Sequence, residues 1–226
     1  MKKTIFILII ISILVSCKKE NQGRDSLPLL FVDDFENNME NWRPNFPQNW
    51  RVMNDNNDMV YYLFKTGPQG SVRAPTSRSI LESYDVTDFE LIVQAKCLTD
   101  TLNLRRDICL FFGYQDSLHY YYAHFSATSD KVHNVIAIVN DADRVKINLE
   151  PTGTSKALLT GEKWYTLKIV RKADSGLIQA FIEDMENPVL TAEDKSFSHG
   201  KIGLGSFDDT ARFTKVKLNG HLLNKK

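Results

Sequence analysis

The residues best suited to chemistry gather in one short segment, His119–Phe125, which reads HYYYAHF. If this segment is a strand, alternation places Tyr120, Tyr122 and His124 on one face and the less polar residues between them on the other. Aromatic rings with polar tips suit stacking against sugars and hydrogen bonding to sugar hydroxyl groups. We therefore predict that the face with Tyr120, Tyr122 and His124 is exposed and lines a groove, while the other face enters the core.

Other polar residues extend this groove in the prediction. Gln94 faces away from the core on an earlier strand, and His133, Asn134 and Arg144 lie on or beside the strands that follow. The predicted ligand-binding residues are therefore Gln94, Tyr120, Tyr122, His124, His133, Asn134 and Arg144. Each also has a structural interpretation: packing for the tyrosines, a satisfied structural role for His124, a loop position for His133 and a solvated side chain for Arg144.

Two kinds of function fit such a groove. It could bind a glycan without chemistry, or cleave one by β-elimination. Elimination needs a base such as Tyr122 or His124 and a group such as Arg144 to stabilise the developing charge, which makes these three the candidate catalytic residues. The carboxylate spacing of a retaining glucanase, Glu-x-Asp-x-x-Glu, is absent, and the nearest acidic cluster, 183–186, falls at a predicted turn.

No cofactor and no zinc site is predicted. His119 and His124 are five positions apart, so they face opposite sides of one strand and cannot bind one metal ion together. A Ca²⁺ site is conceivable where Asp33-Asp34 and Asp208-Asp209 meet, if the two end strands pair and bring these oxygen ligands together. The alternative is that these aspartates serve as capping and turn residues.

The elements that must position these residues are strands, because the dominant hydrophobic period is two. Alternation is clear from Phe89 to Cys97 and from Trp164 to Arg171, and Ala-Asp-Ser-Gly then predicts a hairpin to Leu177–Ile182. Further strands are expected at 29–35, 59–65, 107–114, 119–126, 133–139, 144–148, 188–192, 200–205 and 211–219. Many short strands separated by turn signals favour an all-β sandwich or jelly roll.

The order of features resembles the concanavalin A-like lectin/glucanase superfamily, which includes laminin G-like, glycoside-hydrolase-16-like and 3-keto-disaccharide hydrolase domains. The resemblance covers most of 31–220 and rests on Asp33–Glu36 with Trp42, Asp88–Lys96, Leu110–Phe125, Trp164–Asp184 and Gly200–Leu218. It implies a jelly-roll sandwich of two antiparallel sheets that holds sugar on a concave sheet face. It does not fix an activity, because lectins, hydrolases and lyases share this fold.

Two cysteines flank the polar segment TDTLNLRRD. If that segment is the tip of a hairpin centred near Asn103, Cys97 and Cys109 lie opposite each other and could form a disulfide. The alternative is two buried free thiols.

The N-terminus predicts export. Lys2 and Lys3 precede an apolar run at 4–15, which is too short to span a bilayer and fits a secretion signal. Leu14-Val15-Ser16-Cys17 resembles the lipobox of bacterial lipoproteins, which implies cleavage before Cys17 and its lipidation. The predicted organisation is a signal peptide at 1–16, a lipidated cysteine and tether at 17–30, one jelly roll at 31–220 and a tail at 221–226.

Charge narrows the choice of partner. The chain has 28 basic and 28 acidic residues, so nothing predicts a nucleic-acid surface. Together these features predict a lipid-anchored protein of the cell envelope, on an unassigned side of the outer membrane, that binds a polysaccharide as a binding or accessory module. A glycoside hydrolase or polysaccharide lyase is the first alternative, and a non-enzymatic protein-interaction domain is the second.

Overall fold

The computed structural model describes residues 26–150 and 157–223. Over these ranges the chain forms fifteen strands and one short 3-10 turn, η1 (Pro47–Asn49). No helix in the described ranges is long and apolar enough to cross a membrane. Cys17, with the predicted signal peptide and most of the tether, lies outside the described residues.

The strands form two antiparallel sheets, as the sequence predicted. Sheet A is ordered β13-β12-β11-β6-β15-β4-β3, and β1 also pairs with β15. Its strands are β1 (Leu29–Asp33), β3 (Trp50–Asp55), β4 (Asp58–Leu63), β6 (Val86–Cys97), β11 (Tyr165–Lys172), β12 (Leu177–Ile182), β13 (Leu190–Glu193) and β15 (Ala211–Leu222).

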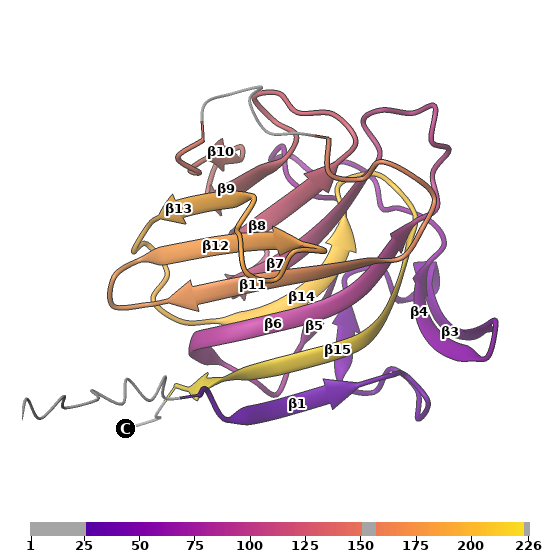
Figure 1. The fold of residues 1–226 in the computed structure, drawn as a ribbon, viewed down its shortest axis with the longest axis horizontal. Helices are drawn as coiled ribbons and strands as arrows, with labels where there is room; N and C mark the ends of the chain where they lie inside the picture. The colour runs from indigo at the N-terminus through magenta and orange to yellow at the C-terminus, as the bar shows by residue number, and fades with distance from the viewer. Residues whose placement is uncertain (1–25, 151–156, 224–226) are drawn as a thin grey trace, which may run out of the picture.

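Sheet B is ordered β10-β9-β8-β7-β14-β5-β2. Its strands are β2 (Trp42–Pro44), β5 (Ser77–Leu81), β7 (Asp107–Asp116), β8 (His119–Ser126), β9 (Val135–Asn140), β10 (Val145–Lys146) and β14 (Lys201–Ser206). Figure 1 shows the strands of sheet A in front of those of sheet B.

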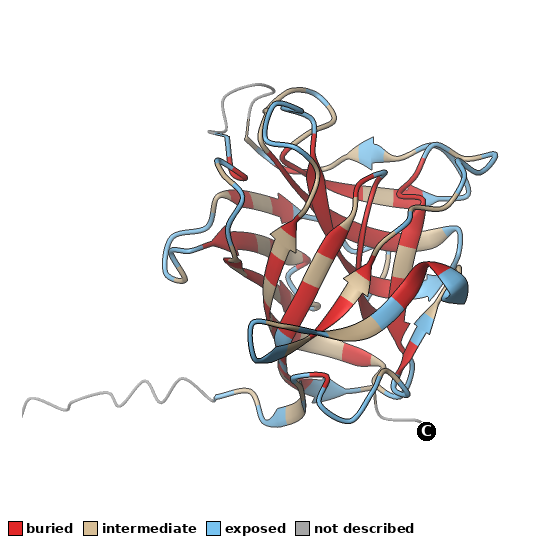
Figure 2. Ribbon diagram, turned by 90° about the vertical axis from the view of Figure 1, so that its right-hand side faces the viewer, coloured by how far each residue is buried: buried red, intermediate tan, exposed pale blue. Residues whose placement is uncertain are grey.

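The main core lies between the two sheets. Alternate residues of β6, such as Leu91 and Val93, face alternate residues of β7 and β8, such as Leu110, Phe112 and Tyr121, and all of them are buried. This arrangement follows from the period of two along each strand, which directs every second side chain inward. In Figure 2 the buried residues run along both sheets, and the exposed residues concentrate in the connecting loops.

A second apolar cluster covers the outer face of sheet B. Phe111, Tyr120 and Tyr122 on this face pack with Ala74, from the segment between β4 and β5, and with Phe207, which follows β14. Both tyrosines are 0% exposed. The sequence assigned their face correctly, since they point away from the main core, but the prediction that this face is open is wrong at these two positions.

The path of the chain corrects two further predictions. β6 and β7 do not form a hairpin around Asn103, because β6 pairs with β11 and β15 in sheet A while β7 pairs with β8 and β14 in sheet B. The segment between them crosses from one sheet to the other. Residues 29 and 30, which were assigned both to the tether and to a strand at 29–35, belong to the strand, since β1 begins at Leu29 and pairs there with Asn219 of β15.

The possible disulfide between Cys97 and Cys109 is therefore not formed. Both cysteines are free and buried. Cys97 packs in the main core, whereas Cys109 packs in the second cluster on the far side of sheet B. Burial raises the pKa of Cys97 to about 12 and also raises that of Cys109, so both remain protonated thiols.

These placements predict that both thiols are shielded in the folded protein and free after unfolding. An alkylating reagent should label Cys97 and Cys109 slowly under native conditions and completely in denaturant without reductant. Peptide mass spectrometry measures the labelling, and a sample reduced before alkylation is the control. A Cys97–Cys109 cross-linked peptide in the unreduced sample would contradict this placement.

Candidate functional site

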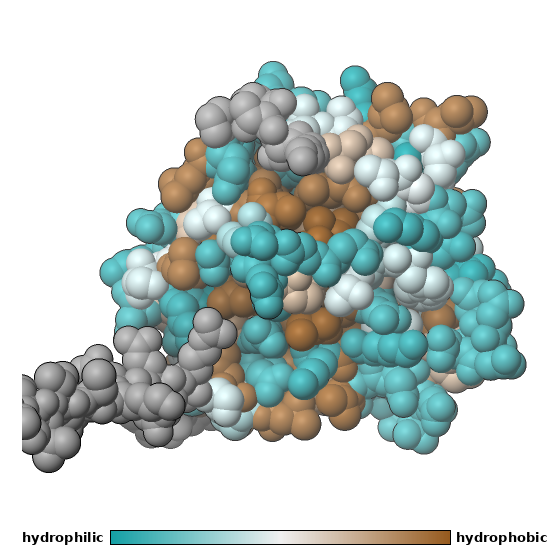
Figure 3. Space-filling view, in the orientation of Figure 1, coloured by the Kyte–Doolittle hydropathy of each residue, from teal (hydrophilic) through white to brown (hydrophobic). Residues whose placement is uncertain are grey.

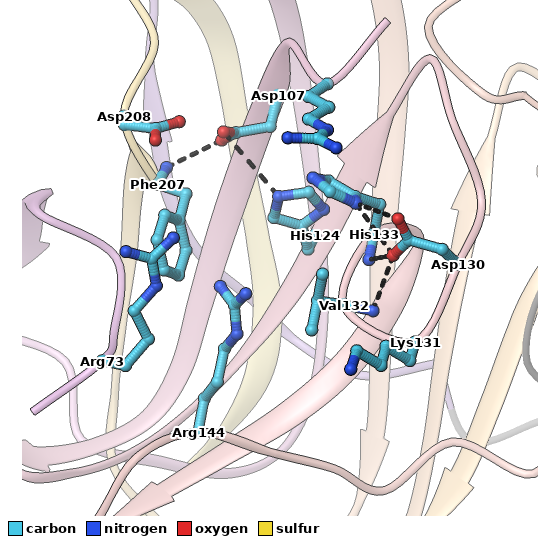
Figure 4. Close-up of a pocket in the computed structure, with 11 residues that line it drawn as sticks. Arg73, Asp107, His124, Asp130, Lys131, Val132, His133, Arg144, Phe207 and Asp208 are labelled. Atoms are coloured by element: carbon cyan, nitrogen blue, oxygen red, sulfur yellow. Dashed lines mark hydrogen bonds and ion pairs between the residues drawn. The ribbon is translucent and has the colours of Figure 1, made fainter.

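A pocket of about 600 Å³ opens on the outer face of sheet B, beside the second apolar cluster. This volume is in the range of small-ligand sites. Most of its lining residues are charged or polar, and they come from loops as well as from β7 and β8 (Figure 4). The lining residues are Arg73, Arg105, Asp107, His124, Asp130, Lys131, Val132, His133, Arg144, Phe207 and Asp208.

Asp107, the first residue of β7, anchors the floor of the pocket. Its carboxylate accepts hydrogen bonds from the Ser206 hydroxyl at 2.8 Å and from the Phe207 N–H at 2.7 Å. Its own N–H donates to the Asp209 carboxylate at 2.8 Å, and the Asp209 N–H donates to the Ser206 hydroxyl at 2.8 Å. These bonds fix the turn after β14 against β7, and so they fix the position of Phe207.

Two histidines lie next to this carboxylate. His124 on β8 is 2% exposed, and its Nε2 lies 3.7 Å from the Asp107 carboxylate. Its ring meets that of His133 edge to face at 5.4 Å between centroids. His133 is held in turn by Asp130, whose carboxylate lies 2.8 Å from His133 Nδ1 and accepts the His133 N–H at 2.9 Å. The two rings therefore form a fixed wall of the pocket.

Two arginines lie against Phe207. The guanidinium carbon of Arg144 is 4.0 Å from the Phe207 ring centroid, and that of Arg73 is 5.1 Å away. Such cation–π contacts hold the side chains without neutralising their charge. The backbone N–H of Arg144 donates to the Arg73 carbonyl at 3.0 Å, and the backbone N–H of Arg73 donates to the Asp143 carboxylate at 2.7 Å. The two loops that carry the arginines are thus tied to each other.

The carboxyl groups at the floor differ in their electrostatics. Burial alone would raise the pKa of Asp107, but the nearby His124 ring and the hydrogen bonds from Phe207 and Ser206 hold it below its usual value. Burial and the charge of Asp107 raise the pKa of Asp208, and the same two causes raise that of Asp209 to about 7. Asp107 is therefore ionised and carries the negative charge at the floor, while Asp209 is partly protonated near neutral pH.

Two groups of side chains at the floor are close enough to hold a cation. One is Asp107, Asp208 and Asp209, and the other is Asp107, Cys109 and His124, with the ligand atoms of each group within 4.8 Å of one another. Asp33, which the sequence placed in a Ca²⁺ site with Asp208-Asp209, belongs to neither group among the described residues. It pairs with Val216 on β15, and its carboxylate accepts the Trp42 indole N–H at 2.9 Å. The Asp33 carboxylate also accepts the Phe35 N–H at 2.8 Å, which is the turn role of the alternative interpretation.

The structure brings three of the predicted residues together in the pocket and separates the others. His124, His133 and Arg144 line the pocket. Gln94 does not, because β6 belongs to sheet A, whose outer face points the opposite way. That face is mostly hydrophilic, with scattered apolar side chains (Figure 3). Asn134 is buried with a positive φ of 52° and accepts the Ser126 N–H at 2.6 Å, so it shapes the turn before β9.

Tyr120 and Tyr122 lie beneath the surface and do not line the pocket. Burial raises the pKa of both hydroxyl groups above the ordinary value for tyrosine. Tyr122 is 0% exposed and does not reach the pocket, and its raised pKa makes deprotonation harder still, so it is poorly placed to act as the base of a β-elimination. The catalytic role predicted for Tyr122 is therefore not supported by its surroundings.

Sequence reasoning missed most of the charged lining. Asp107 was assigned only to a strand, and Arg73 and Phe207 to no role. The segment Phe207-Asp208-Asp209 carried the one available signal, an aromatic residue beside two carboxylates after a strand. Nothing near Arg73 marks it, because its place over Phe207 depends on a contact between distant segments.

Comparison with known proteins establishes the fold. No protein-family model and no curated protein matches the chain. Solved structures do match. Carbohydrate-binding module CBM66 from Bacillus subtilis is 20% identical, with a TM-score of 0.54 over 81% of this chain and 98% of that one. The cellulose-induced protein Cip1 is 12% identical, with a TM-score of 0.57 over 87% of this chain and 100% of that one.

A lectin from Bauhinia forficata, solved in complex with GalNAc, is 12% identical, with a TM-score of 0.50 over 87% of this chain and 100% of that one. At such identities the likeness concerns the fold alone. It confirms the predicted fold class, because the chain is a jelly-roll sandwich of the kind found in lectins and carbohydrate-binding modules.

The raised pKa of Asp209 predicts how stability depends on pH. In the folded protein this carboxyl has a pKa of about 7, whereas the ordinary pKa of an aspartate is 3.8. The stability that it contributes is thus complete below pH 3.8 and is lost as the pH rises toward 7. Asp209→Asn removes this loss. When the pH is raised from about 5 to about 8, the free energy of unfolding of the parent should therefore fall by on the order of 2 kcal/mol more than that of the variant.

Urea unfolding at the two pH values measures this difference. Asp174→Asn is the matched control, because Asp174 is an exposed carboxylate in the turn between β11 and β12. The control should show the pH dependence of the parent. A variant at position 209 that does the same would refute a proton held there by burial and by Asp107.

Proposed function

We propose that the chain binds a carbohydrate in the pocket of Arg73, His124, His133, Arg144 and Phe207. The observation that carries this proposal is the convergence of fixed polar groups on one concave space of about 600 Å³ on the outer face of sheet B. Sugars present hydroxyl groups that both donate and accept hydrogen bonds. The pocket offers guanidinium donors and, at the exposed Asp208, a carboxylate acceptor.

Binding fits this site better than catalysis. Asp107 is 1% exposed, and its carboxylate already accepts two hydrogen bonds from the turn after β14, which leaves it poorly placed to attack a substrate. Tyr122 keeps its proton. A protein-interaction role has less support from the pocket, because protein interfaces bury roughly 800 Å² per partner and this site is a small concavity.

The proposal includes an anchor. The lipobox-like Leu14–Cys17 implies a lipidated Cys17 that holds the sandwich at a membrane of the cell envelope. The chain between Cys17 and β1 then serves as a short tether, which places the pocket where extracellular polysaccharides are encountered.

The binding proposal predicts that the purified protein is retarded in native gels containing at least one polysaccharide from a panel of neutral and acidic types. Arg144→Ala should weaken this binding about tenfold, because a hydrogen bond to a charged group is worth about 1.5–3 kcal/mol. Affinity electrophoresis over a range of polysaccharide concentrations gives the dissociation constants.

Arg51→Ala is the matched control. Arg51 also lies over aromatic rings, with its guanidinium carbon 5.1 Å from the Phe64 centroid, but it belongs to β3 in sheet A. This variant should bind like the parent. If no polysaccharide in the panel is bound, the proposed function fails.

The anchor makes a separate prediction. Cells grown with a labelled fatty acid should incorporate the label into the parent protein, and Cys17→Ser should abolish both the label and membrane association. Cys97→Ser is the control, because Cys97 is buried in the main core and should leave the labelling unchanged. Labelling that persists in Cys17→Ser would show that the lipid is attached to another residue.

A further inference from the structure

Positive side chains outnumber acidic ones in the lining of the pocket, which has Arg73, Arg105, Lys131 and Arg144 against Asp107, Asp130 and Asp208. Arg73 and Arg144 both lie against Phe207, and neither forms an ion pair with any described carboxylate. Arg144 is only partly exposed, so part of its hydration has been removed without a counter-charge. An unpaired arginine in a concave site favours an anionic ligand.

The acidic residues of the pocket, by contrast, are largely occupied. Asp107 accepts hydrogen bonds from the Ser206 hydroxyl and the Phe207 N–H and lies beside His124. Asp130 contacts His133 Nδ1 with both oxygens at 2.8 Å and accepts the Val132 N–H at 2.8 Å. These two carboxylates are compensated within the protein, whereas Asp208 is exposed and lines the pocket together with the arginines.

The two guanidinium groups are also held in place. Both guanidinium groups lie over the Phe207 ring, and the hydrogen bond from the backbone N–H of Arg144 to the Arg73 carbonyl links the loops that carry them. A guanidinium group presents paired N–H donors that match the two oxygens of a carboxylate or a sulfate group. Restraint before binding lowers the entropy cost of such recognition.

We propose that the ligand is an acidic glycan whose carboxylate or sulfate group is bound between Arg73 and Arg144. This inference rests on the proposed carbohydrate-binding function and specifies the ligand class of the same pocket. The sugar ring attached to that group lies toward His133 and Asp208, which line the rest of the pocket. Neutral glycans lack the group that the arginines select.

Matched pairs of polysaccharides test the charge directly. The full-length protein is titrated with polygalacturonate and with the same polymer after methyl esterification, and in parallel with dextran sulfate and dextran. At least one charged polymer should bind about tenfold or more tightly than its neutral partner, since charged hydrogen bonds contribute at that level. The pair that shows this preference identifies the group as carboxylate or sulfate.

Variants test the position. Arg73→Ala and Arg144→Ala should each reduce the preference for the charged polymer about tenfold. Arg144→Lys should lose most of it as well, because lysine keeps the charge without the planar pair of donors. Arg51→Ala in sheet A should keep the full preference, and unfolding midpoints equal to that of the parent establish that each variant is folded.

The outcomes separate this inference from the proposed function. Equal affinity for charged and neutral partners, or binding confined to neutral polysaccharides, would overturn the acidic ligand and leave carbohydrate binding intact. A charge preference that Arg51→Ala reduces as much as Arg144→Ala would also overturn it, since that result means diffuse attraction to the surface. Binding to no polysaccharide of either kind would overturn both.

Discussion

The buried carboxylate of Asp107 is the constraint on which the rest of the site depends. A charged carboxylate removed from water is costly unless hydrogen bonds compensate it. Here the donors come from Ser206 and Phe207, at the turn between β14 and β15. These hydrogen bonds to Asp107 hold the turn at the start of β7, and the turn directs Phe207 over the outer face of sheet B. Arg73 and Arg144 then take their positions from Phe207.

The second apolar cluster explains why the candidate site is a pocket and not a broad open face. β7 and β8 are buried on both of their faces, with the main core on one side and the cluster around Phe111 and Tyr122 on the other. The Thr76 hydroxyl and N–H both donate to the Phe207 carbonyl, which fastens the segment before β5 across sheet B. The end of the face near Asp107 and His124 stays accessible as the pocket of about 600 Å³, and a smaller hollow of about 220 Å³ opens beside Arg78 and Tyr120.

Period-two alternation predicted the strands and the two faces of β8, because these are local properties of the chain. It could not predict which sheet a strand joins, and so Gln94 on β6 was placed beside His124 although the two belong to different sheets. The same gap produced the supposed hairpin between Cys97 and Cys109. The short strands β2, β3 and β5 were missed because they lack a long alternating run. Arg73 was missed because only tertiary contacts bring it to Phe207.

The place where the described chain enters the fold bears on the proposed anchor. β1, the first described strand, pairs with β15 in sheet A (Figure 1). The pocket opens on the outer face of sheet B, the opposite layer. The first strand and the candidate site therefore lie on opposite layers of the sandwich. If Cys17 carries the proposed lipid, Arg73 and Arg144 lie on the layer away from the strand through which the chain enters the fold.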